Sequence, residues 1–369
     1  MKKIPLLLSA AVLLGGLSIA AAADDPLVPL SYLNGTYTQS LLTQAQARID
    51  SRTQTVYDKV VSQTSGTTSP SENPAGLTDA RYKRGDTLTL TTGSGAMLLA
   101  GQVSVRFATG AVIDVTDGKS ISSGSSLLPR HRYLVAENTT AVFSVSSDTA
   151  VLSTEGKVSL SASTTTDFNA LADALAELGL FAGTGTAYGS GYDLEVAPTR
   201  VEGVVMFLRL IGEEKAAQAY TGPCLFVDVP DWAKQYVAYA YSKGYTAGVG
   251  PDAAGNPVFG TSRLIGAPEY LTFVLRALGY RDTGANPDFT WQTALTRGAE
   301  LGVLTKGEAQ WLSSATFLRA HVAYLSYFSL EAPMADGSGT LLDFLSASGA
   351  LDRTLVQQVQ AKVTVQRVS

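Results

Sequence analysis

The strongest constraint in this chain is a pattern that recurs three times in its C-terminal half. Each copy is an apolar, helix-like stretch that ends at a glycine, and these glycines are Gly179, Gly244 and Gly302. They lie 65 and 58 residues apart. Glycine closes a helix well because it adopts positive φ without strain. Repeats of this length are typical of helix-loop-helix units that stack and share one core. We therefore predict three such units within residues 167–352, with a positive φ at each glycine.

The second copy carries the clearest family resemblance. Residues 226–248 read FVDVPDWAKQYVAYAYSKGYTAG, and residues 269–279 read EYLTFVLRALG. This sequence resembles an S-layer homology repeat. The family's Thr-Arg-Ala-Glu signature, at the start of the second helix, is matched by Thr-Arg-Val-Glu at residues 199–202. Residues 266–269 lack the arginine, and residues 318–321 keep it but replace the glutamate by histidine. The resemblance covers the ranges 167–215, 224–282 and, in degenerate form, 286–352, with 353–369 as a C-terminal tail.

The resemblance implies an all-α, pseudo-threefold bundle with a groove between neighbouring repeats. In this family the grooves bind secondary cell-wall polysaccharide, commonly through a pyruvylated terminal sugar. A guanidinium suits such a ketal carboxylate because it donates paired, charge-assisted hydrogen bonds. The resemblance therefore makes Arg200 and Arg319 candidate carboxylate ligands, expected at the groove surface rather than in the core, with Glu202 as their partner. Aromatic side chains can pack on the C–H faces of sugar rings, so the candidate platforms are Phe168, Trp232 and Trp291.

Other roles stay open for these residues. Both tryptophans stand at helix starts, where they could instead pack the bundle core, and Arg200 could pair with Glu202 on the helix surface. Residues 228–231 are expected to cap the helix that follows. Arg276 lies seven residues past the signature position, at the far end of its helix, so we expect it to have no role in ligand binding. Ala267 occupies the arginine position of the second repeat, so one groove is expected to lack its arginine.

Residues 81–163 have a different pattern. Leu88 and Leu90 alternate with threonines, and Val103, Val105 and Phe107 alternate with polar residues. Short runs with period two, separated by Gly, Ser and Asp clusters, are typical of an all-β sandwich or barrel. We predict a small all-β domain here, and the sequence leaves open whether it is a spacer or a lectin-like module.

The N-terminus has the layout of a secretory signal peptide over residues 1–23. Two lysines precede an apolar run at residues 4–19 and a small-residue stretch at residues 20–23. Residues 24–64 are expected to form an extended piece and one helix, because residues 39–63 contain neither Gly nor Pro. The heptad-like stripe of that helix fits either packing within the chain or self-association. Residues 65–80 have the composition of a linker, and no stretch beyond the signal has membrane-spanning length.

The charge excludes nucleic acid as an expected partner. The net charge is −5, and removing the two signal-peptide lysines makes it −7, whereas phosphate backbones require a basic surface. With one Cys and two His, the chain offers no recognisable zinc site. It carries no nucleophile or phosphate-binding motif, so we expect no cofactor, no metal and no enzyme activity. A glycosidase-type pair of carboxylates is the one enzymatic alternative left open.

Together these patterns predict a multidomain α+β protein with an N-terminal helix, a small all-β domain and a helical bundle. The resemblance implies a secreted protein that is held non-covalently at the cell wall or S-layer surface of a Gram-positive-type bacterium. The alternative is a structural subunit of an S-layer or extracellular filament, whose degenerate repeats contact protein. The heptad-like helix and the missing arginine of the second repeat favour that alternative.

The signal-peptide layout makes one direct prediction. We expect the mature chain to begin close to Asp24, because the small residues before it suit signal peptidase. N-terminal sequencing of the secreted protein checks this, and a retained Met1 would contradict export.

Overall fold

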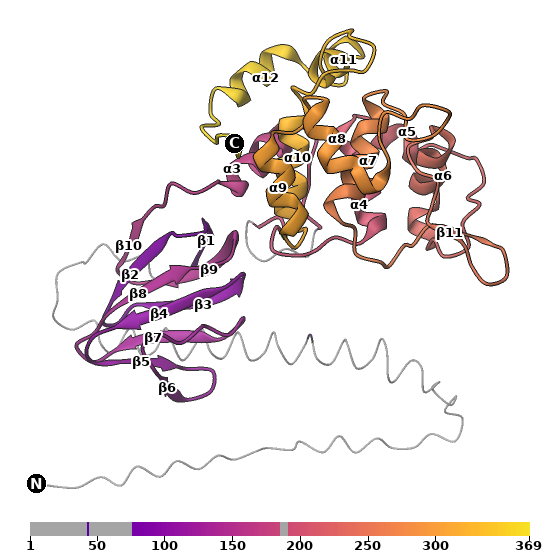
Figure 1. Cartoon of the computed structure of the whole chain (residues 1–369). Helices are drawn as coiled ribbons and strands as arrows, with labels where there is room; N and C mark the ends of the chain where they lie inside the picture. Colours follow the sequence, from indigo (N-terminus) through magenta and orange to yellow (C-terminus); the bar gives the residue numbers. More distant parts are fainter. Residues whose placement is uncertain (1–42, 44–75, 185–190) are drawn as a thin grey trace, which may run out of the picture. The chain divides into compact units, whose positions relative to one another are not determined.

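The computed structural model describes residue 43 and residues 76–184 and 191–369 (Figure 1). The predicted signal peptide, the predicted N-terminal helix apart from Thr43, and residues 65–75 of the predicted linker lie outside the described residues. The chain divides into two units, residues 1–72 and 73–369. The account that follows concerns the second unit.

Ten strands of the second unit form two antiparallel sheets near its N-terminal end. The six-stranded sheet has the order β1 (Thr78–Lys83), β9 (Thr149–Glu155), β3 (Gly95–Ala100), β7 (Arg132–Ala136), β5 (Ala111–Asp114) and β6 (Lys119–Ile121). The four-stranded sheet has the order β10 (Val158–Ser161), β2 (Thr87–Thr91), β8 (Thr140–Val145) and β4 (Val103–Phe107). Strand β1 begins inside the segment that the sequence analysis assigned to the linker.

The two sheets share one hydrophobic core and therefore form a sandwich. Leu88 and Phe143 from the smaller sheet belong to the same buried cluster as Leu98 and Leu152 from the larger one, and all four are fully buried. Alternation explains this burial. In β2, the leucines face the core and the threonines between them are partly exposed, as expected for a half-buried strand.

The remaining elements are helices and short connections. The helices are α3 (Phe168–Glu177), α4 (Arg200–Leu210), α5 (Glu214–Gln218), α6 (Lys234–Ser242), α7 (Ala267–Ala277), α8 (Ala294–Glu300), α9 (Lys306–Ser314), α10 (Arg319–Ser329), α11 (Leu341–Ala347) and α12 (Arg353–Gln360). Two 3-10 turns, η2 (Asp231–Ala233) and η3 (Trp291–Thr293), precede α6 and α8. The strands β11 (Gly250–Pro251) and β12 (Pro257–Val258) form a two-residue pair.

Three of these helices, α4, α7 and α10, form the centre of the helical part. Each contacts the other two, and Phe207 of α4 packs against Phe273 of α7 with ring centres 5.6 Å apart. The hydroxyl of Tyr270 in α7 lies 2.8 Å from the hydroxyl of Ser326 in α10, so the buried polar groups at this contact satisfy each other.

The glycines of the repeat end the first helix of each unit. Gly179, Gly244 and Gly302 have φ of 75°, 75° and 78°, and their amides donate to carbonyls in the last turns of α3, α6 and α8. The prediction of positive φ at these glycines is confirmed. The mixed α+β class is also confirmed, with antiparallel sheets and helices in one chain. Among the described residues, no helix is long and apolar enough to cross a membrane.

A buried histidine joins the helical part to the sheets. His321 of α10 is 1% exposed, and its Nδ1 accepts a hydrogen bond of 3.2 Å from the amide of Leu318. The neutral ring therefore carries its hydrogen on Nε2, which lies 2.9 Å from Oδ2 of Asp148. Arg84 donates to the other oxygen of the same carboxylate. The hydrogen bond from His321, and then Arg84, lower the pKa of Asp148 against the opposing effect of burial.

This carboxylate makes the stability of the protein depend on pH. Because the folded-state pKa of Asp148 is lowered, its contribution is present above the usual carboxyl pKa of about 4 and is lost as the pH falls through the lowered value. We expect Asp148→Asn to lower the melting temperature at pH 7. The difference from the unmodified protein should shrink as the pH falls towards about 3. Melting curves at several pH values measure it, and a difference independent of pH would contradict this role for Asp148.

Candidate binding grooves

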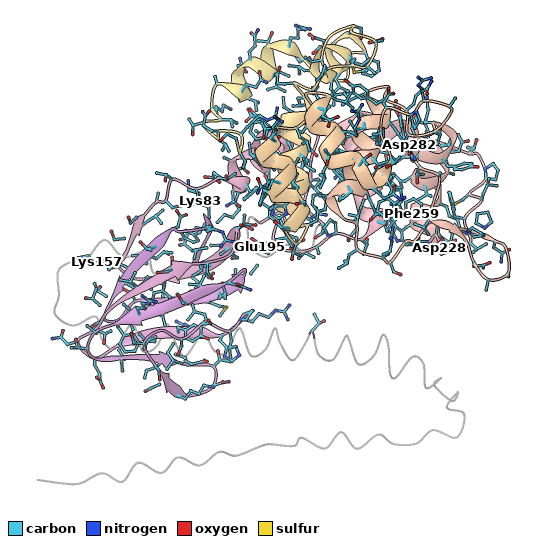
Figure 2. The ribbon with its side chains drawn as sticks, viewed as in Figure 1. Lys83, Lys157, Glu195, Asp228, Phe259 and Asp282 are labelled. Carbon is cyan, nitrogen blue, oxygen red and sulfur yellow. The ribbon has the colours of Figure 1, made fainter. Side chains whose placement is uncertain are left out.

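Two hollows of similar size lie between the repeats, and matching residues line them. Groove A, of about 230 Å³, is lined by Gly183, Thr184, Glu202, Val205, Met206, Arg209, Trp232 and Arg319, together with Ala182. Groove B, of about 250 Å³, is lined by Gly248, Val249, Glu269, Thr272, Phe273, Arg276, Trp291 and Arg200, together with Arg263 and Asp282. In Figure 2, the labelled residue Asp282 marks groove B.

Each groove draws on three repeats in the same way. The second helix of one repeat supplies four residues with spacing three, four and seven from its glutamate, which is Glu202 in groove A and Glu269 in groove B. This spacing places all four on one helix face. A second repeat supplies an arginine from the first turn of its own second helix, and a third repeat supplies a tryptophan. The two grooves therefore share one arrangement of lining residues at eight matching positions.

Arg319 carries an unpaired positive charge in groove A. Its side chain is almost fully buried, and its guanidinium donates to the carbonyls of Ala182 at 2.9 Å and Tyr192 at 3.2 Å. The guanidinium carbon lies 5.6 Å from the centre of the Phe181 ring. Burial lowers the pKa of Arg319, and Glu202 and Asp193 oppose that effect at longer range. Within the described ranges, Arg319 forms no ion pair with a carboxylate.

Arg200 occupies the same position in groove B and has a carboxylate partner. Its Nε donates to the carbonyl of Phe259 at 3.0 Å, and its Nη1 lies 3.1 Å from Oε1 of Glu269. Arg263, which is exposed, pairs with the same carboxylate. The guanidinium lies over the rings of Phe259 and Phe273, at 5.1 and 5.2 Å. Burial lowers the pKa of Arg200 to about 10, with Glu269 opposing that effect.

Both arginines lie deeper than the sequence analysis expected. Arg200 and Arg319 are 6% and 4% exposed, whereas a position at the groove surface was predicted. The aromatic rings below them and the carbonyls around them account for the difference, because these groups bind a guanidinium even away from water. Glu202 is not a hydrogen-bonding partner of either arginine in the described residues. Its carboxylate instead accepts from the amide and hydroxyl of Thr199 in a capping box.

Arg276 lies at groove B, although the sequence analysis expected it to have no role in ligand binding. Seven residues correspond to two helical turns, so Arg276 lies on the same face as Glu269 and lines groove B. It forms a bidentate pair with Asp282, at 3.1 and 2.5 Å, and donates to the carbonyl of Tyr245 at 2.8 Å. Arg209 occupies the matching position of groove A and pairs with Glu214 at 2.7 and 2.5 Å.

The three candidate aromatic platforms do not share one environment. Trp232 is 58% exposed at the rim of groove A, and Trp291 is 55% exposed at the rim of groove B. Neither is a core residue. Phe168, at the matching position of the first repeat, is 4% exposed and packs against Trp311 with ring centres 6.0 Å apart. It therefore presents no free face, and the expectation of a platform there is wrong.

Asp228 has a different role from the one expected from the sequence. The sequence analysis expected residues 228–231 to cap the next helix, but the Asp228 side chain does not cap it. Its carboxylate accepts from three successive amides at residues 259–261 and so fixes the loop that supplies the Arg200 carbonyl partner.

In the sheets, Asp114, Asp117 and His131 bring possible metal-ligand atoms within 4.8 Å of one another. Asp114 is engaged there by His131 and two backbone amides.

Comparisons with known proteins do not identify the chain. No protein-family model matches it, and no curated protein matches it. Matching solved structures include the coconut allergen cocosin, the 11S globulin procruciferin from Brassica napus and recombinant pro-11S globulin of pumpkin, at 14%, 11% and 11% identity. These matches cover 25%, 23% and 30% of this chain and 30%, 22% and 35% of those chains, each with a TM-score of 0.15. The chain thus spans little more than a third of these structures at most.

The burial of Arg200 predicts a structural effect that its exposed neighbour should not share. We expect Arg200→Ala to lower stability by about 2–4 kcal/mol, because the Phe259 carbonyl loses a charged donor and a buried ion pair is broken. Arg263→Ala removes an exposed cation from the same carboxylate and should cost about 0–1 kcal/mol. Urea unfolding of both variants measures the difference. Equal losses would show that the buried position of Arg200 does not contribute.

Proposed function

We propose that this protein anchors non-covalently to an anionic cell-wall polysaccharide through grooves A and B. The observation that carries the proposal is the duplication of one arrangement, in which a buried arginine faces a groove with an exposed tryptophan at its rim. The S-layer homology resemblance supports the same ligand class. Under this proposal the helical part is a pseudo-threefold bundle of three such repeats, and the protein is secreted and held at the cell wall.

The unpaired guanidinium of Arg319 favours an anionic ligand. A charge removed from water costs several kcal/mol unless another group compensates it. Two carbonyls and an aromatic face compensate part of that cost but supply no negative charge. A ligand carboxylate in groove A would supply it through charge-assisted hydrogen bonds. The ketal carboxylate of a pyruvylated sugar has this chemistry.

The exposed tryptophans favour a sugar ring beside that carboxylate. An indole that is more than half exposed contributes little to the fold, yet it offers a large apolar face to a ligand. The ring C–H groups of a sugar can cover that face while its hydroxyls stay in water. Each groove thus combines an anion-binding group with an apolar platform. Two such grooves would also make attachment to a polymer multivalent.

A structural subunit that contacts protein is the second candidate. One observation favours it: Ala267 stands where the third repeated arginine would be, so the three grooves cannot be equivalent. Protein–protein interfaces also use tryptophans as anchors. The two candidates differ in whether the ligand is a sugar.

The tryptophans allow a test that leaves the fold intact. We expect Trp232→Ala and Trp291→Ala each to weaken binding to purified cell-wall sacculi about ten- to thirtyfold, which corresponds to about 1.4–2 kcal/mol. The double variant should lose more than either single variant, because both grooves then lack a platform. Binding is measured by co-sedimentation with sacculi, before and after acid removal of the polysaccharide.

Phe344→Ala is the matched control. Phe344 in α11 is an aromatic residue that is 49% exposed and lines neither groove. It should bind sacculi as the unmodified protein does, and all variants should keep their melting temperature. Full binding by a folded Trp232→Ala, Trp291→Ala double variant would overturn the polysaccharide proposal and leave the protein-contact candidate.

A further inference from the structure

The third set of repeat positions is occupied by the chain's own residues. Six of the eight positions that match the two grooves are Ala267, Phe168, His321, Tyr324, Leu325 and Phe328, and we call these six set C. All except Phe328 are buried. Set C has alanine in place of the groove arginine and phenylalanine in place of Arg209 and Arg276. The glutamate position holds His321, whose Nε2 faces Asp148.

The segment 363–369 lies against set C. The amide of Val368 donates to the hydroxyl of Tyr324 at 2.8 Å, and the hydroxyl of Thr305 donates to the Val368 carbonyl. A Cβ added to Gly307 would lie 2.0 Å from the carbonyl oxygen of Ser369, so only a glycine fits beside the segment there. Three valines of the segment, Val363, Val365 and Val368, also pack against the bundle core.

Arg367 of this segment makes contacts like those of Arg276, whose position in set C is occupied by Phe328. In groove B, Arg276 donates to the carbonyl of Tyr245, the residue after the repeat glycine. Arg367 donates to the carbonyl of Val303, the residue after the corresponding glycine, at 2.9 Å. Its guanidinium lies over the ring of Phe328, at 5.3 Å.

Arg367 also reproduces the ion pair that the groove arginines Arg209 and Arg276 form. Arg276 pairs with Asp282 and Arg209 pairs with Glu214, each through two hydrogen bonds. Arg367 pairs with Glu308 of α9 through two hydrogen bonds of 2.8 and 2.5 Å. Glu308 is fully buried and also accepts from the hydroxyl of Tyr324 at 2.7 Å. Removal of Arg367 would therefore leave a buried carboxylate without its cation.

We infer that the bundle has two ligand grooves and a third that is permanently filled by segment 363–369, with Arg367 in the place of Arg209 and Arg276. The count of two ligands rests on the proposed function, whereas the filling of set C does not. The segment acts as an internal clasp, and set C serves stability where grooves A and B serve binding. Loss of the clasp does not create a third site, because Ala267 supplies no guanidinium.

The clasp is tested without any ligand by Arg367→Ala in the full chain. We expect the melting temperature to fall by about 5–10 °C, because a buried carboxylate loses its partner. Hydrogen exchange at the Val368 amide should accelerate about tenfold or more, while the Val356 amide, inside α12, keeps its protection. The added change Glu308→Gln should recover part of the loss by removing the unpaired charge.

Arg353→Ala is the matched control, because Arg353 belongs to the same end of the chain but forms an exposed pair with Asp343. It should shift the melting temperature by less than about 2 °C. Equal effects of Arg353→Ala and Arg367→Ala, or unchanged exchange at Val368, would overturn the clasp.

The number of grooves is tested by calorimetric titration with a methyl glycoside that carries a 4,6-linked pyruvate ketal. The unmodified protein and Arg367→Ala should both bind two ligands per chain, and the glycoside without the ketal should bind more weakly. A stoichiometry of three for either protein would overturn the inference. Absence of binding would count against the proposed function alone, and the exchange measurement would then decide the role of the segment.

Discussion

The candidate grooves depend on an arginine that crosses from one repeat to the next. Arg200 begins α4 but donates to a carbonyl of the second repeat, and Arg319 begins α10 but donates to carbonyls of the first. Neutral carbonyls satisfy the hydrogen-bonding groups of a guanidinium without neutralising it. The same contacts that join neighbouring repeats therefore leave a positive charge at the floor of the groove between them. In groove B, Glu269 pairs with that charge, whereas in groove A no carboxylate of the described residues forms an ion pair with it, and Glu202 and Asp193 act only at longer range.

A second arginine fixes the shape of each groove wall. Arg209 and Arg276 are tied to carboxylates only five and six residues further along the chain. These short pairs hold the loop after the second helix against the helix itself. Because both ends of the groove are held by arginines with defined partners, the tryptophan at the rim is the least constrained member. Its exposure makes it the residue through which binding can be separated from folding.

The sequence predicted the parts of the fold that follow from one element alone. Alternation identified β2 and β4, since one face of each is buried, and the glycines identified the ends of α3, α6 and α8. Strand β9 escaped detection because it is buried at six successive positions, which removes the period of two. Helix α9 was missed although its capping box, formed by Thr305 and Glu308, is a local signal. The role of Arg367 was missed because it depends on contacts between distant segments. The seven-residue spacing from Glu269 to Arg276 was visible in the sequence. Seven residues make about two helical turns, so both side chains lie on one helix face and line groove B together, which the sequence analysis did not consider.

Set C shows how a degenerate copy of the groove positions can be retained. Two of its departures from grooves A and B, the histidine and the phenylalanine, are matched by internal contacts. Histidine in the glutamate position still accepts the capping amide through Nδ1 and gains Asp148 through Nε2. Phenylalanine in the arginine position gains the guanidinium of Arg367. Alanine in the clamp position leaves no buried cation that needs an anion. In groove A, Arg319 keeps a desolvated charge that no carboxylate of the described residues pairs with, whereas set C is satisfied by the chain's own residues. Under the proposed function, a ligand carboxylate in groove A therefore supplies the charge that the fold leaves out there, and set C adds stability without binding a ligand.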